Sequence, residues 1–222
     1  MMKIALCLSG YFNSLVDLTS KGIDGFDHLK RHVFSKGDVD VYIHSWDKEN
    51  ESQIKTLYNP KYAIFEHQID FSDLIKEKGY NTIPNPPRTP QTIYSHFYST
   101  CQSFKLIEGN YDWVIKSRFD IGRINRATSG PHNPNNPYPV QCINFNPTLP
   151  SNKLYMANWQ YLESDGPADM WFYGGQDIME PFSTIFDNID NYFECNAIHL
   201  YKNFMVQNGM WDNKTLLNTT WE

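Results

Sequence analysis

Charged side chains of both signs follow an apolar run in the stretch YDWVIKSRFDIGRI, residues 111–124. Residues 113–115 are typical of a buried strand, and Lys116, Arg118 and Asp120 then occupy alternate positions, which share one face of a strand. Such charges either pair with one another or face a ligand. Cations neutralise phosphate oxygens and a carboxylate binds a hard metal ion. The stretch therefore favours a phosphorylated ligand with a divalent cation.

Two other predicted strands end in residues that suit the same ligand. KIALCLSG ends at Ser9 and Gly10 and is followed by Tyr11, and DVDVYIHSW ends with His44 and Trp46. A glycine turn permits close approach of the backbone, and an aromatic ring can stack on a base. The carboxyl ends of parallel strands are where open α/β sheets bind ligands. We therefore expect these strand ends to form one site.

The periodicity of apolar residues alternates between strand and helix along the first half of the chain. Thr89 and Pro90 are a good N-cap and first residue for the longest helix. Strands are predicted over 3–10, 38–46, 61–67 and from 113, and helices over 15–34, 48–58, 71–78 and 89–108. This alternation predicts an α/β fold, a single domain with a central mixed, mostly parallel sheet flanked by helices.

The second half of the chain has a different composition. Residues 122–150 are rich in Asn and Pro and are predicted to form a long loop, and long loops in compact domains are often functional. Two strands follow, within 153–159 and 168–175, and then helices over 176–186 and 194–208. Asp169 stands at the start of the last predicted strand, where a carboxylate at the cleft would serve as a general base.

Composition excludes several classes of protein. The net charge of −6 argues against a nucleic-acid partner, and the four cysteines have no CxxC spacing that would suggest a thiolate zinc site. No apolar run approaches the length of a membrane span, and the N-terminus does not resemble a signal peptide. We therefore expect a cytoplasmic protein with no integral membrane segment. Aromatic residues make up 15%, a proportion that suits a site for sugars or bases.

Four segments resemble nucleotide-sugar glycosyltransferases of the GT-A fold: CLSGYF, DVYIHSW, IYSHFYSTCQSFKLIE and YDWVIKSRFDI. They are similar especially to small transferases from surface-polysaccharide gene clusters and some large viruses. The resemblance implies one Rossmann-like domain over residues 1–222, with a donor-binding half at about 1–121 and an acceptor half at about 122–222. It implies a hexosyltransferase-like enzyme that moves a sugar from a nucleotide diphosphate sugar to a hydroxyl of a glycan or glycoprotein.

The same resemblance implies roles for particular residues. The family's Asp-x-Asp motif corresponds here to Arg118-Phe119-Asp120, so its first carboxylate is replaced by Arg118. Asp120 would hold a manganese or magnesium ion, with His199 as a further ligand, while Lys116 and Arg118 would offset the diphosphate charge. Asp169 would be the catalytic base. The other residues expected to contact the donor are Ser9, Gly10, Tyr11, Trp46, Arg88 and Ser95.

Several of these assignments have simpler alternatives. Arg118 and Asp120 also fit a structural ion pair at the end of a strand. Arg88, before the N-terminus of the helix at 89–108, could reach a phosphate there or be a solvated loop residue. The literal Asp38-Val39-Asp40 begins a strand, at the wrong end for the site, and is interpreted as a surface pair. At the level of function, the alternatives are a sugar nucleotidyltransferase and a catalytically inactive nucleotide- or sugar-binding domain.

Overall fold

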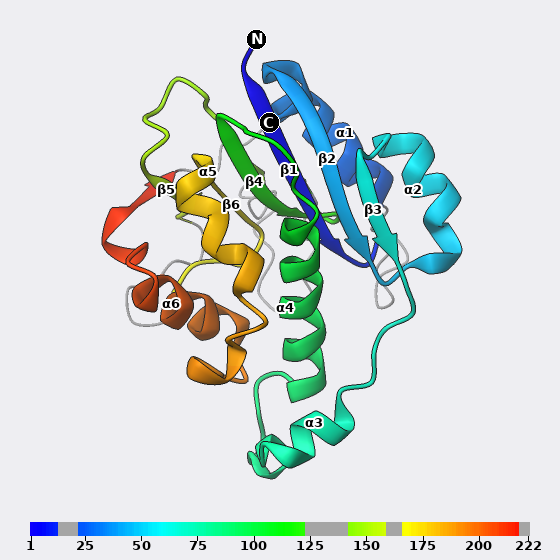
Figure 1. Ribbon diagram of the computed structural model, residues 1–222, viewed down its shortest axis with the longest axis vertical. Coiled ribbons are helices and arrows are strands. Elements are labelled where there is room, and N and C mark those ends of the chain that lie inside the picture. Colours follow the sequence, from blue (N-terminus) through cyan, green and yellow to red (C-terminus); the bar gives the residue numbers. More distant parts are fainter. Residues whose placement is uncertain (13–21, 123–141, 159–165, 218–222) are drawn as a thin grey trace, which may run out of the picture.

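A seven-stranded mixed sheet with the order β3-β2-β1-β4-β6-β5-β7 runs through the molecule (Figure 1). The computed structural model describes residues 1–12, 22–122, 142–158 and 166–217. The strands are β1 (Lys3–Gly10), β2 (Asp38–Ser45), β3 (Tyr62–Phe65), β4 (Trp113–Arg118), β5 (Leu154–Ala157), β6 (Trp171–Gly174) and β7 (Lys214–Leu217). The first four are parallel, and β6 is antiparallel to both of its neighbours. The predicted α/β fold with a mixed, mostly parallel sheet is confirmed.

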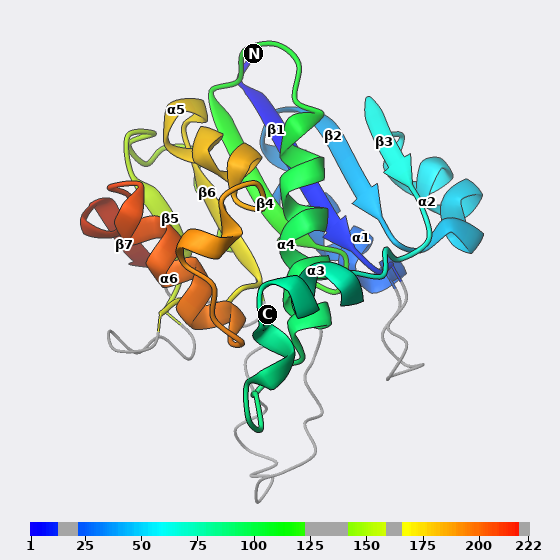
Figure 2. The same cartoon turned by 60° about the horizontal axis from the view of Figure 1, so that its bottom comes forward.

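Helices cover both faces of this sheet, as Figures 1 and 2 show. The α-helices are α1 (Gly22–His32), α2 (Glu51–Tyr58), α3 (Ser72–Glu77), α4 (Pro90–Lys105), α5 (Gln176–Met179) and α6 (Ala197–Gln207). Short 3-10 turns are η1 (Phe34–Lys36), η2 (Lys48–Asn50), η3 (Tyr80–Thr82), η4 (Glu180–Thr184), η5 (Ile189–Asn191) and η6 (Trp211–Asn213). Helices α1 and α2 lie on one face, and α4, α5 and α6 lie on the other.

Alternation along the central strands divides the core between these two faces. In β1, Ala5 and Cys7 pack with α4 and α6, whereas Leu6 and Leu8 pack with α1 and α2. Helix α4 buries an apolar stripe of Ile93, Phe97, Cys101 and Phe104 against the sheet. Its N-cap is Thr89, whose side chain accepts a hydrogen bond from the backbone N–H of Thr92. Both the stripe and the cap agree with the sequence prediction.

Two elements of the second half differ from the prediction. The helix expected over 176–186 is α-helical only to Met179 and continues as the 3-10 turn η4, which has Pro181 in its first turn. Proline lacks the N–H that would continue the α-helical hydrogen bonds. Strand β7 was not predicted, because four residues at the edge of a sheet leave little periodicity in a sequence.

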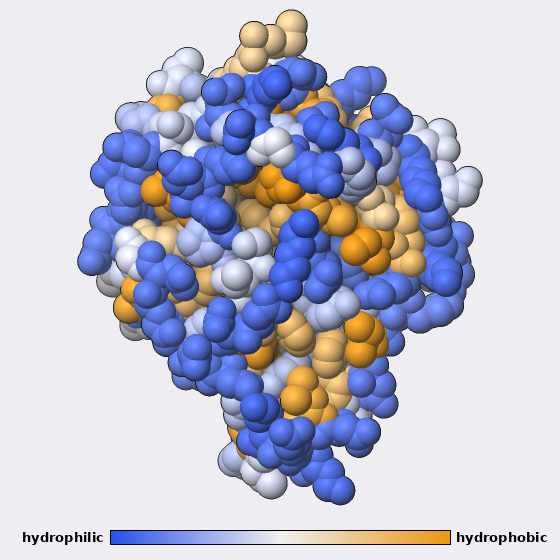
Figure 3. All heavy atoms as spheres, in the orientation of Figure 1, coloured by the Kyte–Doolittle hydropathy of each residue, from blue (hydrophilic) through white to orange (hydrophobic). Residues whose placement is uncertain are grey.

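The four cysteines are all buried and free. Among the described residues, no helix has the length and apolarity needed to cross a bilayer. The surface in Figure 3 is mostly hydrophilic, with hydrophobic side chains gathered in patches beside α4.

Candidate functional site

The order of the strands changes direction between β1 and β4. From β1 the chain extends to β2 and β3 on one side of the sheet, and it returns through α4 to β4 on the other side (Figure 1). Ser9 at the end of β1 pairs in register with Arg118 at the end of β4. Open α/β sheets bind ligands beyond the carboxyl ends of their strands at such a switch point. The strand ends that the sequence singled out therefore meet where a ligand is expected.

Arg118 lies between two carboxylates that come from different parts of the chain. Its Nε and Nη2 donate to the two carboxylate oxygens of Asp120 at 2.9 and 2.7 Å, and its Nη1 donates to Oδ2 of Asp169 at 3.2 Å. We call Arg118, Asp120 and Asp169 the Arg118 cluster. Their side chains are 32%, 17% and 25% exposed, so the cluster is enclosed but reachable. The two charges of the RFD triplet thus pair with each other, and a third charge joins them.

The cluster holds Arg118 and Asp169 in their charged forms. Burial disfavours the charge of Asp169, but Arg118, with His96 and Lys116, outweighs this effect and keeps the pKa of Asp169 below its usual range. Burial likewise disfavours the guanidinium charge, and the attraction of Asp120 and Asp169 outweighs it, so the pKa of Arg118 is raised. At neutral pH the cluster therefore contains an ionised guanidinium and an ionised Asp169.

Lys116 lies beneath this cluster with no exposed surface. Its Nζ donates to the backbone carbonyl of Asp169 and lies 5.3 and 5.1 Å from the ring centroids of Phe172 and Tyr201. Burial lowers the pKa of Lys116 to about 7, and neighbouring charges modify this in both directions. The side chain therefore supports the backbone that carries Asp169, and it does not reach solvent.

Hydroxyl groups connect the cluster to the end of β1. His96 Nε2 lies 3.9 Å from Asp169 Oδ2 and is hydrogen-bonded to Tyr201 Oη at 3.0 Å. Tyr201 Oη lies 3.5 Å from Thr100 Oγ1, which is 3.4 Å from Ser9 Oγ. Burial, with the nearby charge of Lys116, lowers the pKa of His96 to about 3, so its ring is neutral at physiological pH.

Sequence reasoning did not identify His96 or Tyr201 as site residues. The available signal is the spacing of polar residues on α4: His96 and Thr100 are four apart on a helix whose apolar stripe faces the core, and residues four apart share one face. Tyr201 is an aromatic residue on an otherwise apolar helix, α6, and only the tertiary packing brings its hydroxyl to His96.

A second set of hydrogen bonds fixes the turn after β1. The backbone N–H of Gly10 donates to Ser99 Oγ at 2.9 Å, Ser99 Oγ is 2.8 Å from His44 Nδ1, and His44 Nε2 is 2.9 Å from Glu66 Oε1. Gly10 has a φ of +100°, which only glycine adopts readily. A Cβ at this position would meet no atom of the described residues within 4 Å. The role of Gly10 in admitting a ligand stays a prediction.

The turn that carries Asp120 is packed directly against α1. A Cβ added to Gly25 would lie 1.8 Å from the carbonyl oxygen of Phe119, so only glycine allows α1 to approach this closely. The Phe119 ring is fully buried and meets Phe12 edge-on. The residue between Arg118 and Asp120 is therefore fixed by the core. Strand β4 ends at Arg118, so Asp120 lies in the turn that follows and not, as predicted, on the strand face of Lys116 and Arg118.

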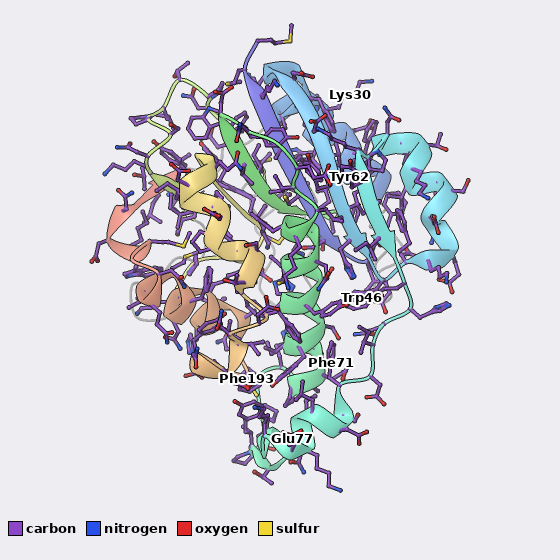
Figure 4. All side chains as sticks on the ribbon, viewed as in Figure 1. Lys30, Trp46, Tyr62, Phe71, Glu77 and Phe193 are labelled. Carbon is purple, nitrogen blue, oxygen red and sulfur yellow. The ribbon has the colours of Figure 1, made fainter. Side chains whose placement is uncertain are left out.

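Gln68 connects two other predicted donor residues. Tyr11 Oη donates to Gln68 Oε1 at 3.0 Å, and Gln68 Nε2 donates to Ser95 Oγ at 2.8 Å. Trp46, labelled in Figure 4 at the end of β2, is 4% exposed and stacks on Tyr98 of α4 with ring centroids 5.4 Å apart. Its indole is part of the packing between β2 and α4, and this burial leaves little of the ring exposed for stacking on a base.

Arg88 and His199 make no contact with the Arg118 cluster among the interactions of the described residues. Arg88 is exposed before α4, and its backbone N–H donates to the carbonyl of Cys195. His199 is half-buried on α6. Two residues along a helix correspond to a rotation of about 200°. Because Tyr201 faces the cluster, His199 points to nearly the opposite side of α6.

The donor set of the site does not fit the predicted metal ion. Within the described part of the chain, no three His, Cys, Asp or Glu side chains are grouped so that they could hold a metal. The two carboxylates that do converge, Asp120 and Asp169, are bonded to Arg118. The structure therefore does not assemble Asp120 and His199 into the expected pair of ligands.

The acidic pair at 38–40 lies at the amino end of β2, as the sequence interpretation placed it. Asp40 accepts hydrogen bonds from Lys61 at 2.7 Å and from Tyr111 at 2.6 Å. Of the loop predicted over 122–150, residues 123–141 lie outside the described residues, so its expected place on the acceptor side stays a prediction.

A cavity of about 450 Å³ lies at the amino end of β4, whereas the Arg118 cluster lies at the carboxyl end of this strand. Tyr111, Trp113, Leu149, Gln176 and Ile178 are among the residues that line it. We place the functional site at the switch point and not in this cavity, because the converging charged groups and the turn at Gly10 lie at the carboxyl ends of the strands.

Comparisons with known proteins give distant structural likeness alone. No protein-family model matches the chain, and no curated protein matches it. Among solved structures, the apo form of mouse xyloside xylosyltransferase 1 is similar, with a TM-score of 0.44 and 10% sequence identity, over 99% of this chain and 86% of that chain. A likeness at this level assigns no residue role.

Proposed function

We propose that the chain is a glycosyltransferase that moves a sugar from a nucleotide diphosphate sugar to a hydroxyl of a glycan or glycoprotein. The observation that carries this proposal is the meeting of the Arg118 cluster with the turn at Gly10, at the switch point of the sheet. The resemblance of the four sequence segments to nucleotide-sugar transferases points to the same class of ligand.

Gly10 and Arg118 are the groups suited to the diphosphate. The glycine turn at Gly10 lets a phosphate approach the backbone, and the guanidinium of Arg118 is a fixed planar donor for phosphate oxygens. When the bond between the sugar and the diphosphate breaks, negative charge develops on the leaving diphosphate. A cation that is already held in place stabilises this charge without reorganising.

Asp169 is the candidate base for the acceptor hydroxyl. Its carboxylate is part-exposed at the edge of the cluster and is ionised at neutral pH, which is the form that accepts a proton. The same pairing with Arg118 that keeps Asp169 ionised also makes it a weak base. This observation favours one second candidate function, a binding domain that holds the nucleotide sugar without transferring it.

Thermal-shift binding of UDP, GDP, CDP and dTDP tests the donor site. A ligand at a hundred times its Kd stabilises the folded state by about 2.7 kcal/mol, which for a chain of this length raises the melting temperature by roughly 5–10 °C. We expect one nucleotide to give this shift, and the Arg118→Ala variant to lose most of it. Asp187→Asn, which alters an exposed ion pair with Lys105, is the control and should keep the shift. If none of the nucleotides at millimolar concentration changes the melting temperature, the proposal is wrong.

Hydrolysis of the donor sugar separates the enzyme from the binding domain. A transferase without its acceptor commonly passes the sugar slowly to water, and Asp169→Asn should slow this reaction while leaving the nucleotide-induced shift in place. If the protein binds the nucleotide sugar but neither the wild type nor Asp169→Asn releases sugar, the chain is the binding domain.

A further inference from the structure

The guanidinium of Arg118 stands where two carboxylates from separate segments converge. Asp120 follows β4 and Asp169 precedes β6, and each directs oxygen atoms at the same group. We propose that Arg118 is a built-in cation that takes the place of a divalent metal at this site, so that the site binds a nucleotide diphosphate without metal. The part that concerns the nucleotide rests on the proposed function, whereas the part that concerns metal exclusion does not.

The carboxylate oxygens that would bind a metal are already in use. Both oxygens of Asp120 and Oδ2 of Asp169 accept hydrogen bonds from Arg118 at distances between 2.7 and 3.2 Å. Magnesium binds oxygen ligands at about 2.0–2.1 Å, and calcium at about 2.3–2.6 Å, so a metal would have to displace the guanidinium to bind these oxygens.

The described residues also offer no third ligand to complete a metal site. The guanidinium is bonded to both carboxylates, and the amino group of Lys116 is held at the carbonyl of Asp169. His96, the nearest imidazole to Asp169, uses its Nε2 in a hydrogen bond with Tyr201. A divalent ion would therefore find both carboxylates already bonded to Arg118 and no third ligand within the described residues.

Arg118 keeps donors for an anion after both carboxylates are satisfied. A guanidinium has five N–H groups, and three of them donate to carboxylates in the described part of the structure. The two others can donate to a phosphate oxygen, and the 32% exposure of the side chain allows a ligand to reach them. Because two carboxylates orient the guanidinium, little side-chain entropy remains to be lost when a phosphate binds.

Removal of the guanidinium should convert the site into a metal site. In Arg118→Ala the carboxylates of Asp120 and Asp169 lose the guanidinium to which both are bonded, and two carboxylates are a favourable start for a manganese site. We expect isothermal titration with Mn²⁺ alone to show no binding to the wild type with a Kd below about 1 mM. For Arg118→Ala we expect a Kd that is lower by at least about tenfold. The double variant Arg118→Ala/Asp120→Asn should lose that gain.

The matched control is Lys105→Ala, which removes the cation from an exposed pair with Asp187 and should gain no manganese binding. The proposal is overturned if the wild type binds Mn²⁺ and the Asp120→Asn variant does not. It is also overturned if a folded Arg118→Ala variant binds Mn²⁺ no more tightly than the wild type. If Arg118→Ala does not fold, Arg118→Met keeps the packing of the side chain and is used instead. The wild-type titration requires no variant to fold.

Binding of the nucleotide found by thermal shift is then repeated in EDTA and in Mn²⁺. We expect the same Kd within about twofold in both, whereas a loss of more than tenfold in EDTA would overturn the metal-independent part. The manganese titrations contain no nucleotide. If no nucleotide binds at all, the proposed function fails, and the titrations still decide whether Arg118 excludes a metal.

Discussion

Replacement of Lys116 by methionine removes a charge from the interior with little change in side-chain length. Lys116 is fully buried, and its amino group lies against the rings of Phe172 and Tyr201 and donates to the carbonyl of Asp169. Burial lowers its pKa to about 7, whereas an exposed lysine titrates at about 10.4. Methionine fills irregular space in a core without a titrating group.

The lowered pKa predicts how stability depends on pH. Between the folded and unfolded pKa values the unfolded chain binds one more proton than the folded protein, so the free energy of unfolding rises as pH rises through this window. The slope is at most about 1.4 kcal/mol per pH unit, and between pH 7.5 and 8.5 it amounts to about 1.2 kcal/mol for a folded pKa of about 7. Lys116→Met should lack this contribution.

Urea unfolding followed by tryptophan fluorescence, in half-unit steps from pH 7 to pH 9, measures the effect. The quantity of interest is the wild-type free energy of unfolding minus that of Lys116→Met, because other groups that titrate in both proteins cancel. We expect this difference to increase by about 1 kcal/mol between pH 7.5 and 8.5. Lys105→Met, at an exposed lysine, is the control and should give a constant difference. A constant difference for Lys116→Met as well would refute the argument that burial neutralises Lys116.

Three further variants test the scaffold of the site. Ser99→Ala leaves the N–H of Gly10 without its side-chain acceptor and should lower the free energy of unfolding by about 1–3 kcal/mol. The control Ser52→Ala, at an exposed serine, should change this free energy by less than about 0.5 kcal/mol. Equal effects of the two variants would contradict the prediction. Gly25→Ala drives a Cβ into the carbonyl of the turn after β4 and should destabilise by about 1–3 kcal/mol or more in the same assay; a neutral result would show that α1 moves freely. Burial lowers the pKa of His28 to about 3, so stability should fall as pH is lowered from 6.5 towards 4, by up to about 1.4 kcal/mol per unit, and His28→Leu should reduce that slope; an unchanged slope would count against it.

The parts of this fold that sequence predicts well are those set by local chemistry. Three buried strands, the cap at Thr89 and the apolar stripe of α4 follow from periodicity and capping preferences alone. The common face of Lys116 and Arg118 follows from the alternation of a strand. Neither prediction requires knowledge of the rest of the chain.

The remainder of the site depends on contacts between distant segments. The second partner of Arg118 could not be found from the triplet, because Asp169 comes 51 residues later, just before the neighbouring antiparallel strand β6. Trp46 was expected to face a ligand because it ends a strand, but the stacking of Tyr98 depends on how α4 crosses the sheet. The hydroxyl of Tyr201 likewise reaches His96 only through the docking of α6.

The Arg118 cluster forms only when β6 pairs with β4 in the observed antiparallel register. Lys116 pairs with Phe172 and Ser117 with Trp171, and Asp169 lies two residues before the first residue of β6. A slip of this pairing by one residue would exchange the two faces of β6 and carry Asp169 away from Arg118. The ion pair between Arg118 and Asp169 is therefore present only when β6 pairs with β4 in the correct register. If the pairing were shifted by one residue, Asp120 would be the sole carboxylate of the cluster bonded to Arg118.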